Sequence, residues 1–338
     1  MRKLASIQKI IAIAPIEGAD AIEKATVLGW QLVTKKGEFA VGSLCVYCEI
    51  DCLMPEKPEF EFLRPRNFRI RTVRLKGQIS QGICFPLHFL PANFVVEEGA
   101  DCTETLGIFK YEPPIPAHLA GLMKGRFPSF IPKTDETRVQ VLQDLLNKYE
   151  GEPCFVTEKL DGSSATFYWR EGEFGVCSRN LELLEDPENT FWKVANELKI
   201  KEKLTTLGGN FALQGELVGE GIQGNKLCLK AQTVFFFNLF DIDKAEYVSF
   251  QDFGLKMSEL GLNSVPVLHE NYALKNKISD LVELAKVKSQ INPKVWAEGV
   301  VIRPLWEKRD TEFSSDLGNS GRISFKVINA EFLLKYDE

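Results

Sequence analysis

The sequence lacks the features that mark secreted, membrane-spanning and histidine-rich metal proteins. No stretch approaches the roughly 18 to 20 apolar residues of a membrane-spanning helix, and polar residues interrupt the apolar ones near the N-terminus, as in Ser6-Ile7-Gln8-Lys9. We therefore expect neither a signal peptide nor a membrane segment, and a cytoplasmic location. Histidine is also scarce, because His88, His118 and His269 are the only three and lie far apart.

Positive charge is in short supply as well. The chain has 41 Lys and Arg against 47 Asp and Glu, which gives a formal net charge of −6. Any nucleic acid would therefore have to be held by a local basic patch. The 8 cysteines, without a secretory signal, indicate reduced thiols in a cytosol-like compartment. Cys45, Cys48 and Cys52 are close enough to suggest a metal site, but no second cysteine pair matches their spacing, so we interpret them as core residues.

The chain is long enough for two domains or one large one. Residues 1–112 contain short apolar runs separated by glycine-marked turns, which is typical of a small β-barrel such as the OB fold. Residues 113–132 are rich in proline and glycine and are interpreted as a linker, so that 133–338 forms a second domain. We expect strands over 4–13, 27–34, 40–50, 68–75 and 82–86, and helices over 136–148 and within 185–205 and 250–288.

Basic residues gather in the segment 64–76, which we call the basic segment. It carries six cations in thirteen residues, together with Phe68. A basic strand of this kind suits contact with a phosphate backbone, although an edge strand can also be kept charged against aggregation. The alternation slips between Arg71 and Arg74, so the six cations cannot share one face of a regular strand. We favour the first interpretation, in which the first domain positions a nucleic acid.

The second domain is organised around an octapeptide, TEKLDGSS at residues 157–164. If the residues before it are extended, Lys159 and Asp161 point the same way, and Gly162 lets the chain turn. A lysine becomes a nucleophile when burial or a neighbouring cation lowers its pKa. The octapeptide alone is weak evidence, since Asp-Gly turns and Glu-Lys surface pairs are common.

Four further apolar runs follow, each with one or two polar residues, as expected of strands that line a polar cleft. They are LQGELV at 213–218, VFFFNLFDI at 234–242, AEGVVIR at 297–303 and ISFKVIN at 323–329. In order and spacing, the five segments resemble the motifs of covalent nucleotidyltransferases, which comprise ATP-dependent RNA and DNA ligases and messenger-RNA capping enzymes. The resemblance implies ATP-grasp-like antiparallel sheets plus helices for the second domain, and therefore an α+β protein.

Forming a covalent lysyl-nucleotide requires a neutral amine, a cation on the α-phosphate and a pocket for the base. The resemblance implies that Lys159 is the nucleophile that takes AMP from ATP, and that Lys326 holds the α-phosphate. Acids between buried strand residues are costly without a partner. Asp161, Glu216 and Glu298 are therefore expected to bind one hydrated Mg²⁺ or Mn²⁺ ion.

The resemblance also implies the remaining nucleotide contacts. Glu158 would reach the adenine amino group and Phe240 would stack on the base, although Phe236 lies on the same face of a regular strand. Arg179 would bind a substrate phosphate, or else is an ordinary strand-end cation. Arg138 would reach the nucleotide or the catalytic core, because KTDETR at 133–138 resembles a segment of the RNA ligases of Naegleria and Deinococcus type. Its alternative is an exposed helix cation.

Two features separate the members of this family. Many of its ligases carry Lys-x-Lys in the closing motif, whereas here Ser324 or Ile328 stands in place of the second lysine, and we expect Lys308 or Arg309 to contact the phosphates instead. The resemblance implies an OB domain after the closing motif in DNA ligases and capping enzymes. Here the barrel comes first and few residues follow Lys326, which favours an RNA ligase over both of them. We expect an ATP-dependent RNA ligase, acting as a monomer on RNA or an RNA-containing nicked duplex. The alternatives are a GTP-using capping-type enzyme and a non-catalytic nucleic-acid-binding protein.

Overall fold

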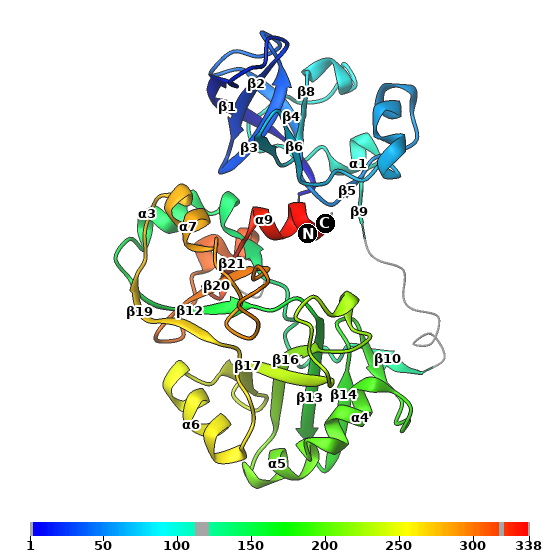
Figure 1. Cartoon of the computed structure of the whole chain (residues 1–338), viewed down its shortest axis with the longest axis vertical. Coiled ribbons are helices and arrows are strands. Elements are labelled where there is room, and N and C mark those ends of the chain that lie inside the picture. Colours follow the sequence, from blue (N-terminus) through cyan, green and yellow to red (C-terminus); the bar gives the residue numbers. More distant parts are fainter. Residues whose placement is uncertain (1–2, 112–121, 318–320, 337–338) are drawn as a thin grey trace.

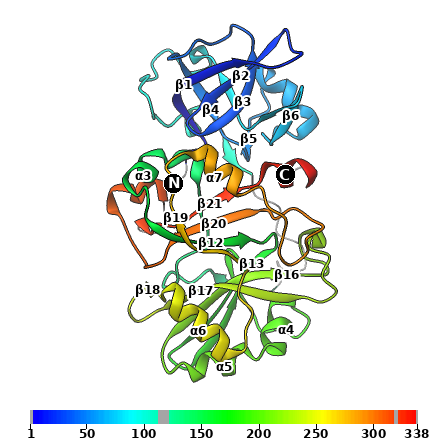
Figure 2. The same ribbon diagram turned by 60° about the vertical axis from the view of Figure 1, so that its left-hand side comes forward.

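The chain folds into three stacked layers. The computed structural model describes residues 3–111, 122–317 and 321–336. In Figure 1 a small barrel lies at one end, a five-stranded sheet with α3 (Gln143–Lys148) and α7 (Ile278–Leu284) lies in the middle, and a seven-stranded sheet with further helices lies at the other end. Figure 2 shows the same order from another side. The predicted α+β class, with the barrel first, is confirmed.

The barrel is an antiparallel sheet with the strand order β3-β2-β1-β4-β8. Its strands are β1 (Ala5–Pro15), β2 (Ile22–Val27), β3 (Trp30–Lys35), β4 (Leu44–Cys48) and β8 (Ile83–Phe85). The first half of β1 pairs with β4 and the second half with β2, and the register shifts between Ile10 and Ala12. Such a bulge bends the strand and lets a small sheet curl.

Apolar and thiol side chains fill the barrel. Trp30, Leu32 and the cysteines Cys45, Cys48 and Cys52 are fully buried, and none of these cysteines forms a disulfide. Their interpretation as core residues is therefore confirmed. Two short strand pairs complete this part of the chain, namely β5 (Cys52–Leu53) with β9 (Phe109–Lys110), and β6 (Val73–Leu75) with β7 (Gln78–Ser80).

The five-stranded sheet has one apolar face and one face with polar side chains. Its order is β11 (Thr137–Arg138), β21 (Phe325–Ile328), β20 (Gly299–Pro304), β12 (Pro153–Lys159) and β19 (Val267–Ala273). Val156, Val300 and Val327 pack in one core with Leu145 of α3 and Leu281 of α7. Because side chains alternate along a strand, the residues between them face the other way, toward the seven-stranded sheet. These are Phe155, Thr157, Lys159, Val301, Arg303, Ser324 and Lys326.

The seven-stranded sheet closes the other side of this cleft. Its order is β10 (Met123–Arg126), β15 (Leu181–Leu183), β14 (Glu173–Cys177), β13 (Ser163–Arg170), β16 (Phe211–Val218), β17 (Thr233–Asp241) and β18 (Glu246–Tyr247). One face buries an apolar core against α4 (Thr190–Glu197), α5 (Ile200–Thr206) and α6 (Phe250–Leu260). The expected helices within 185–205 and 250–288 are therefore present. The opposite face carries Ser164, Gln214 and Glu216, since their strand neighbours Ala165, Leu213 and Leu217 lie in that core.

The last helix joins the barrel to the rest of the chain. α9 (Ala330–Tyr336) lies between the barrel and the five-stranded sheet in both views (Figures 1 and 2). Phe332 and Leu333 are buried in the hydrophobic core of the barrel, and Arg74 forms an ion pair with Glu331 at 2.8 Å. Among the described helices, none has the length and apolar character needed to cross a membrane.

The helix expected over 136–148 is wrong in its first half. Thr137–Arg138 forms β11, which pairs in parallel with β21, and a 3₁₀ turn (Val139–Val141) precedes the short α3. The helical spacing of Val139, Leu142 and Leu145 reflects burial in a common core rather than one continuous helix. Contacts far along the chain, with β21, override the local pattern.

The strand expected over 68–75 is also mostly wrong. A 3₁₀ helix (Pro58–Arg66) is followed by Asn67 and Phe68 with φ of 50° and 58°, and only Val73–Leu75 is a strand. Phe68 is buried, so it offers no ring to a base. Arg64, Arg69 and Arg74 each pair with an acid. The strand expected over 27–34 is divided at Leu28 and Gly29, between β2 and β3.

Candidate active site

Lys159 is the last residue of β12 and projects into the cleft. Its side chain is 24% exposed, and its Nζ lies 2.5 Å from Glu298 Oε2, which precedes β20. Gly162 then brings the chain against β16, since a Cβ at Gly162 would lie 2.4 Å from the carbonyl oxygen of Leu217. This close approach places Asp161 and Lys159 beside Glu216.

The carboxylates around Lys159 determine its charge. Burial lowers the pKa of Lys159, but the negative charges of Glu298 and Glu216 outweigh that effect, and the pKa is raised above its usual value. Burial likewise raises the pKa of Glu216 to about 8; the nearby Asp161 adds to this rise, whereas Lys159 opposes it. The protein therefore holds Lys159 as an ammonium ion. The carboxylates around it cannot all be ionised without a cost in free energy.

The predicted metal ligands do not yet form a metal site. Within 3–111, 122–317 and 321–336, no group of three or more acids, cysteines and histidines is arranged to hold a metal ion. Glu298 is paired with Lys159, and Asp161 with Lys226 at 3.0 Å. Carboxylate oxygens are the ligands that Mg²⁺ prefers. The donor chemistry therefore fits such an ion, while two of the donors are held by lysines in this conformation.

Lys226 is a neighbour that the sequence analysis did not identify. Its Nζ lies 5.1 Å from the ring centre of Phe332 and 5.2 Å from that of Tyr336, both on α9. Because Phe332 is part of the barrel core, the Asp161–Lys226 ion pair connects the octapeptide to the barrel side of the molecule. Its only sequence signal was a lysine in a glycine-rich segment after β16.

Glu158 is almost fully buried and keeps one oxygen without a partner. Its Oε2 accepts a hydrogen bond from the backbone N–H of Gln290 at 2.8 Å, whereas Oε1 is buried and meets no donor in the described residues. Burial raises the pKa of this carboxyl group. A buried acceptor without a donor is costly, and a nucleobase amino group is a donor of the kind that it lacks.

Phe240 lies on the same face of the seven-stranded sheet as Gln214 and Glu216, but other side chains cover its ring. It is 2% exposed and packs edge-on against Tyr247. The pairing of β16 with β17 shifts between Gln214 and Gly215, so that Phe237 is an extra residue, and Phe236 and Phe240 lie on opposite sides of the sheet. Phe237, in contrast, is half-buried and lines a cavity of about 750 Å³ together with Phe155 and Thr157 of β12.

Lys326, Arg138 and Arg179 converge on one end of the cleft. Arg138 stands opposite Lys326 in the pairing of β11 with β21. Arg179 forms an ion pair with Asp135, and although burial raises the pKa of Asp135, Arg179 and Lys326 contribute to a net lowering. The segment that leads into β11 therefore brings together the three cations that are predicted to bind phosphate.

Arg138 is also bound from the barrel. Its Nη2 lies 3.4 Å from Asp51 Oδ2, and Arg69 reaches Oδ1 of the same carboxylate at 2.7 Å. The backbone N–H of Gly29 donates to the carbonyl oxygen of Gln140 nearby. Arg138 is thus a contact between the two domains and not an exposed helix cation.

Lys308 and Arg309 do not take the place of a second closing lysine. They follow β20 at Pro304, which pairs with Cys154 at the opposite end of β12 from Lys159. Lys308 forms an ion pair with Glu152 at 2.6 Å, and Arg309 donates to the carbonyl oxygen of Ala245. The expectation that either residue contacts the phosphates is therefore wrong for this conformation.

Comparison with known proteins agrees with this architecture. A family model described as RNA ligase matches residues 152–328, and one described as an OB-fold domain matches residues 4–87. The RNA ligase of Naegleria gruberi with pyrophosphate is 39% identical, with coverage of 100% of this chain and 99% of that chain and a TM-score of 0.89. A mutant of that ligase with AMP and Mn matches at 39% identity over 98% of both chains, with a TM-score of 0.88. Another mutant, with ATP and Mn, matches at 38% identity over 98% of both chains, with a TM-score of 0.87. No curated protein gives a significant match.

An OB-fold barrel followed by a two-sheet domain with a lysine among carboxylates is the architecture of a nucleotidyltransferase. The chain belongs to the RNA ligase family, as the order of its motifs predicted.

Proposed function

We propose that this chain is an ATP-dependent RNA ligase that joins 5′-phosphate and 3′-hydroxyl ends through a lysyl-AMP intermediate on Lys159. The observation that carries the proposal is the position of Lys159, at the end of β12 and beside Glu298, Glu216 and Asp161, in a chain of the RNA ligase family. The related Naegleria ligase has been solved with ATP, with AMP and with pyrophosphate, which are the nucleotide substrate and the two leaving products of such a three-step reaction.

The reaction has three steps. Lys159 Nζ attacks the α-phosphorus of ATP, a phosphorus–nitrogen bond forms and pyrophosphate leaves. AMP then passes from Lys159 to the 5′-phosphate of the RNA, and a 3′-hydroxyl displaces AMP to make the phosphodiester. Lys159 must be neutral to attack, whereas its carboxylate neighbours favour the ammonium form. Neutralising these carboxylates would lower the pKa of Lys159 and release its proton.

Asp161, Glu216 and Glu298 would hold Mg²⁺ or Mn²⁺. When bound, such an ion neutralises phosphate charge that develops during transfer. The residues fit because they are oxygen donors, and because burial raises the pKa of Glu216 to about 8, so that a bound cation would favour its ionised form. Glu298 would have to leave Lys159, and Asp161 would have to leave Lys226, before either could ligate the ion.

The nucleotide would be held by side chains from both sheets. Glu158 Oε1 would accept a hydrogen bond from the adenine amino group, since it is buried and has no hydrogen-bond partner within the described residues. We assign base stacking to Phe237 instead of Phe240, since Phe240 is enclosed by other aromatic rings. Lys326 and Arg138 would hold the α-phosphate, and Arg179 a substrate phosphate.

The RNA substrate would be an RNA strand or an RNA-containing nicked duplex, and the protein would act as a monomer in the cytoplasm. All eight cysteines are free thiols, which supports a reducing compartment. Arg66 and Lys76 of the basic segment are exposed, and we assign them to backbone contacts. Sealing of nicked duplexes and of single strands, compared at several salt concentrations, distinguishes the two substrates.

The decisive experiment is incubation with ATP labelled at the α-phosphate and Mg²⁺, followed by denaturing electrophoresis. Wild type and Lys193→Ala, which alters an exposed lysine of α4, should give a labelled band, and Lys159→Ala should give none. No band from folded wild type with any of several divalent ions would refute the enzyme. Labelling by GTP instead of ATP would favour the capping-type alternative.

A further inference from the structure

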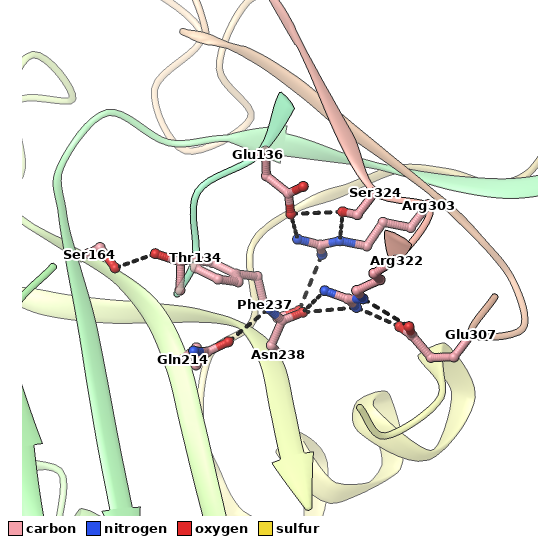
Figure 3. A network of polar contacts seen from close by, with 10 residues as sticks. All are labelled: Thr134, Glu136, Ser164, Gln214, Phe237, Asn238, Arg303, Glu307, Arg322 and Ser324. Carbon is pink, nitrogen blue, oxygen red and sulfur yellow. Dashed lines mark hydrogen bonds and ion pairs between the residues drawn. The ribbon is translucent and has the colours of Figure 1, made fainter. Parts of the chain in front are cut away.

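One buried guanidinium in the cleft binds three different parts of the chain. Arg303 of β20 is 5% exposed at its side chain. Its Nε donates to Ser324 Oγ at 2.8 Å, Nη2 to Glu136 Oε1 at 3.0 Å and Nη1 to the carbonyl oxygen of Phe237 at 3.4 Å. Figure 3 shows the three partners arranged around this one side chain.

Each partner lies within two residues of a proposed nucleotide contact. Ser324 precedes Lys326 by two positions, so both side chains face the cleft. Glu136 precedes Arg138 by two positions in the segment that becomes β11. Phe237 itself is the residue proposed to stack on the base. Arg303 thus connects the base contact with the two α-phosphate contacts, across both sheets.

The contacts also reinforce one another. Ser324 Oγ donates to Glu136 Oε1 at 2.7 Å and accepts from Arg303. Arg303, Ser324 and Glu136 are therefore each hydrogen-bonded to the other two. Thr134 Oγ1 and Ser164 Oγ share a hydrogen bond of 2.7 Å (Figure 3). Gln214 donates to the carbonyl oxygen of Pro132 at 2.8 Å, so the segment before β11 is fixed to the seven-stranded sheet as well. The segment that carries Glu136 and Arg138 is therefore held from both sides.

The guanidinium group is the chemical reason for this arrangement. It is planar and presents several donors in a rigid fork, whereas a lysine ammonium is a compact point charge on a flexible stem. An ammonium group also has three donors, but only the planar fork holds the hydroxyl, the carboxylate and the carbonyl oxygen at fixed angles to one another. Ser324, at one of the two positions where a second closing lysine was expected, is one of these partners.

We propose that Arg303 is a positioning residue for adenylyl transfer, which sets Phe237, Lys326 and Arg138 relative to one another through its three hydrogen bonds. Ser324 and Glu136 act together with Arg303, and the closing motif of this protein has one lysine instead of two. This inference rests on the proposed function and adds to it the residues that orient the nucleotide. A shift of about 1 Å in such contacts can cost on the order of 100-fold in rate.

The first test compares Arg303→Lys with wild type. This variant keeps a positive charge and loses the fork, so we expect kcat/KM for adenylylation to fall by about 10- to 100-fold, with KM for ATP raised and kcat lowered. The control is Ile302→Ala, which perturbs β20 from its apolar face. It should lower Tm and leave kcat/KM of the folded protein within about threefold of wild type.

The second test isolates one hydroxyl group. Ser324→Thr and Ser324→Val add the same volume at a buried site, and only threonine keeps the hydroxyl. We expect the threonine variant to be about 3- to 10-fold more active than the valine variant, the value of one hydrogen bond. Equal activity of the two variants, or equal losses in Arg303→Lys and Ile302→Ala at matched folded fraction, would overturn the positioning role.

ATP binding by calorimetry keeps this inference separate from the lysyl-AMP proposal. If folded wild type binds ATP without becoming labelled, the lysyl-AMP step fails, while weaker binding by Arg303→Lys would still support the positioning role. If wild type is labelled and Arg303→Lys matches it in KM, kcat and affinity, the inference fails and the proposed function stands. Folded wild type that neither binds ATP nor becomes labelled would overturn both.

Discussion

The barrel and the two-sheet domain bury different kinds of side chain. The barrel core consists mainly of apolar groups and thiols, such as Trp30, Leu32 and Cys45, and Glu49 is the one charged side chain buried among the described residues of the barrel. The cleft of the two-sheet domain buries charge, in Glu158, Arg303 and Arg322. Burying charge costs free energy unless it is paired, and replacing a buried ion pair by apolar groups is often neutral or stabilising. Charge retained in the cleft is therefore better explained by chemistry than by stability.

The boundary between the two regions combines both features. Apolar Phe332 and Leu333 of α9 enter the barrel core, while Asp51 of the barrel pairs with Arg138 of β11. A Cβ at Gly29 would lie 2.6 Å from Ile278 Cδ1 and 2.9 Å from Gln140 Cα, so the β2–β3 turn fits closely on the two-sheet domain. The barrel is thus expected to affect the cleft through this contact, and not only through bound RNA.

The largest expected effect is in the cleft, for Glu216→Gln. We expect adenylylation to fall by about 100-fold or more, because a ligand for the metal ion is lost. Stability should behave in the opposite way. The pKa of Glu216 is raised from 4.5 to about 8, so between these values the folded protein binds more protons than the unfolded chain, and wild type loses stability as pH rises.

Denaturant unfolding of the metal-free protein tests this prediction. Glutamine at position 216 does not titrate, so the stability of the variant relative to wild type should increase from pH 5 to pH 8. The control is Glu202→Gln, an exposed acid of α5, which should change neither activity nor this trend. A glutamine variant that is less stable than wild type at pH 8 would mean that Glu216 contributes to stability in the cleft.

The converse effect is expected in the barrel, for Leu32→Ala. Leu32 is fully buried, and truncation should lower the free energy of unfolding by about 2 to 5 kcal/mol through lost contacts and a cavity. Adenylylation per folded molecule should stay unchanged, because Leu32 packs in the barrel core and belongs to neither of the cores that support the two sheets of the cleft. Chemical denaturation and active-site labelling of the same samples measure both quantities. A large loss of labelling at full folding would remove the contrast between the two regions.

A smaller effect is expected at the boundary, for Asp51→Asn. Asp51 has a φ of 69°, a conformation that asparagine also tolerates, so the substitution removes charge with little backbone strain. Arg138 would lose its acidic partner, and we expect adenylylation to fall by about 3- to 10-fold. The matched control is Glu331→Gln, which breaks the more exposed Arg74–Glu331 pair. Equal rates for both variants would show that the barrel does not orient Arg138.

The sequence predicted those parts of the site that depend on local strands. Lys159, Glu216, Glu298 and Lys326 lie in or beside apolar runs whose alternation places each side chain toward the cleft. The sequence placed Phe236 and Phe240 on one strand face, whereas an extra residue at Phe237 puts them on opposite faces; a bulge of this kind arises from pairing between strands and not from local composition.

Contacts between distant segments could not be read from the sequence. Glu136 belongs to a helical pattern by spacing, yet Arg303 and Ser324, more than 160 residues further along, bind its carboxylate. Lys226 lies in a glycine-rich segment without periodicity, and its pairing with Asp161 exists only once β16 and the octapeptide are side by side. Residues of this kind carry chemistry without a local pattern.

The smallest expected effect on activity concerns the thiols, and it tests how tightly each region is closed. Cys228, in the segment after β16, is exposed, whereas the other seven cysteines are buried, five of them in the barrel. Burial raises the pKa of Cys102 to about 11 and that of Cys154 to about 12, which suppresses their reactive thiolates. A chromogenic disulfide reagent should therefore react quickly with one thiol in the native protein and with all eight after unfolding. Cys228→Ser should abolish the fast phase and leave adenylylation unchanged. A second fast thiol in that variant, traced by peptide mapping to one of the five barrel cysteines, would mean that the barrel opens on the timescale of the reaction and is the less rigid of the two regions; mapping to Cys154 or Cys177 would mean this of the two-sheet domain.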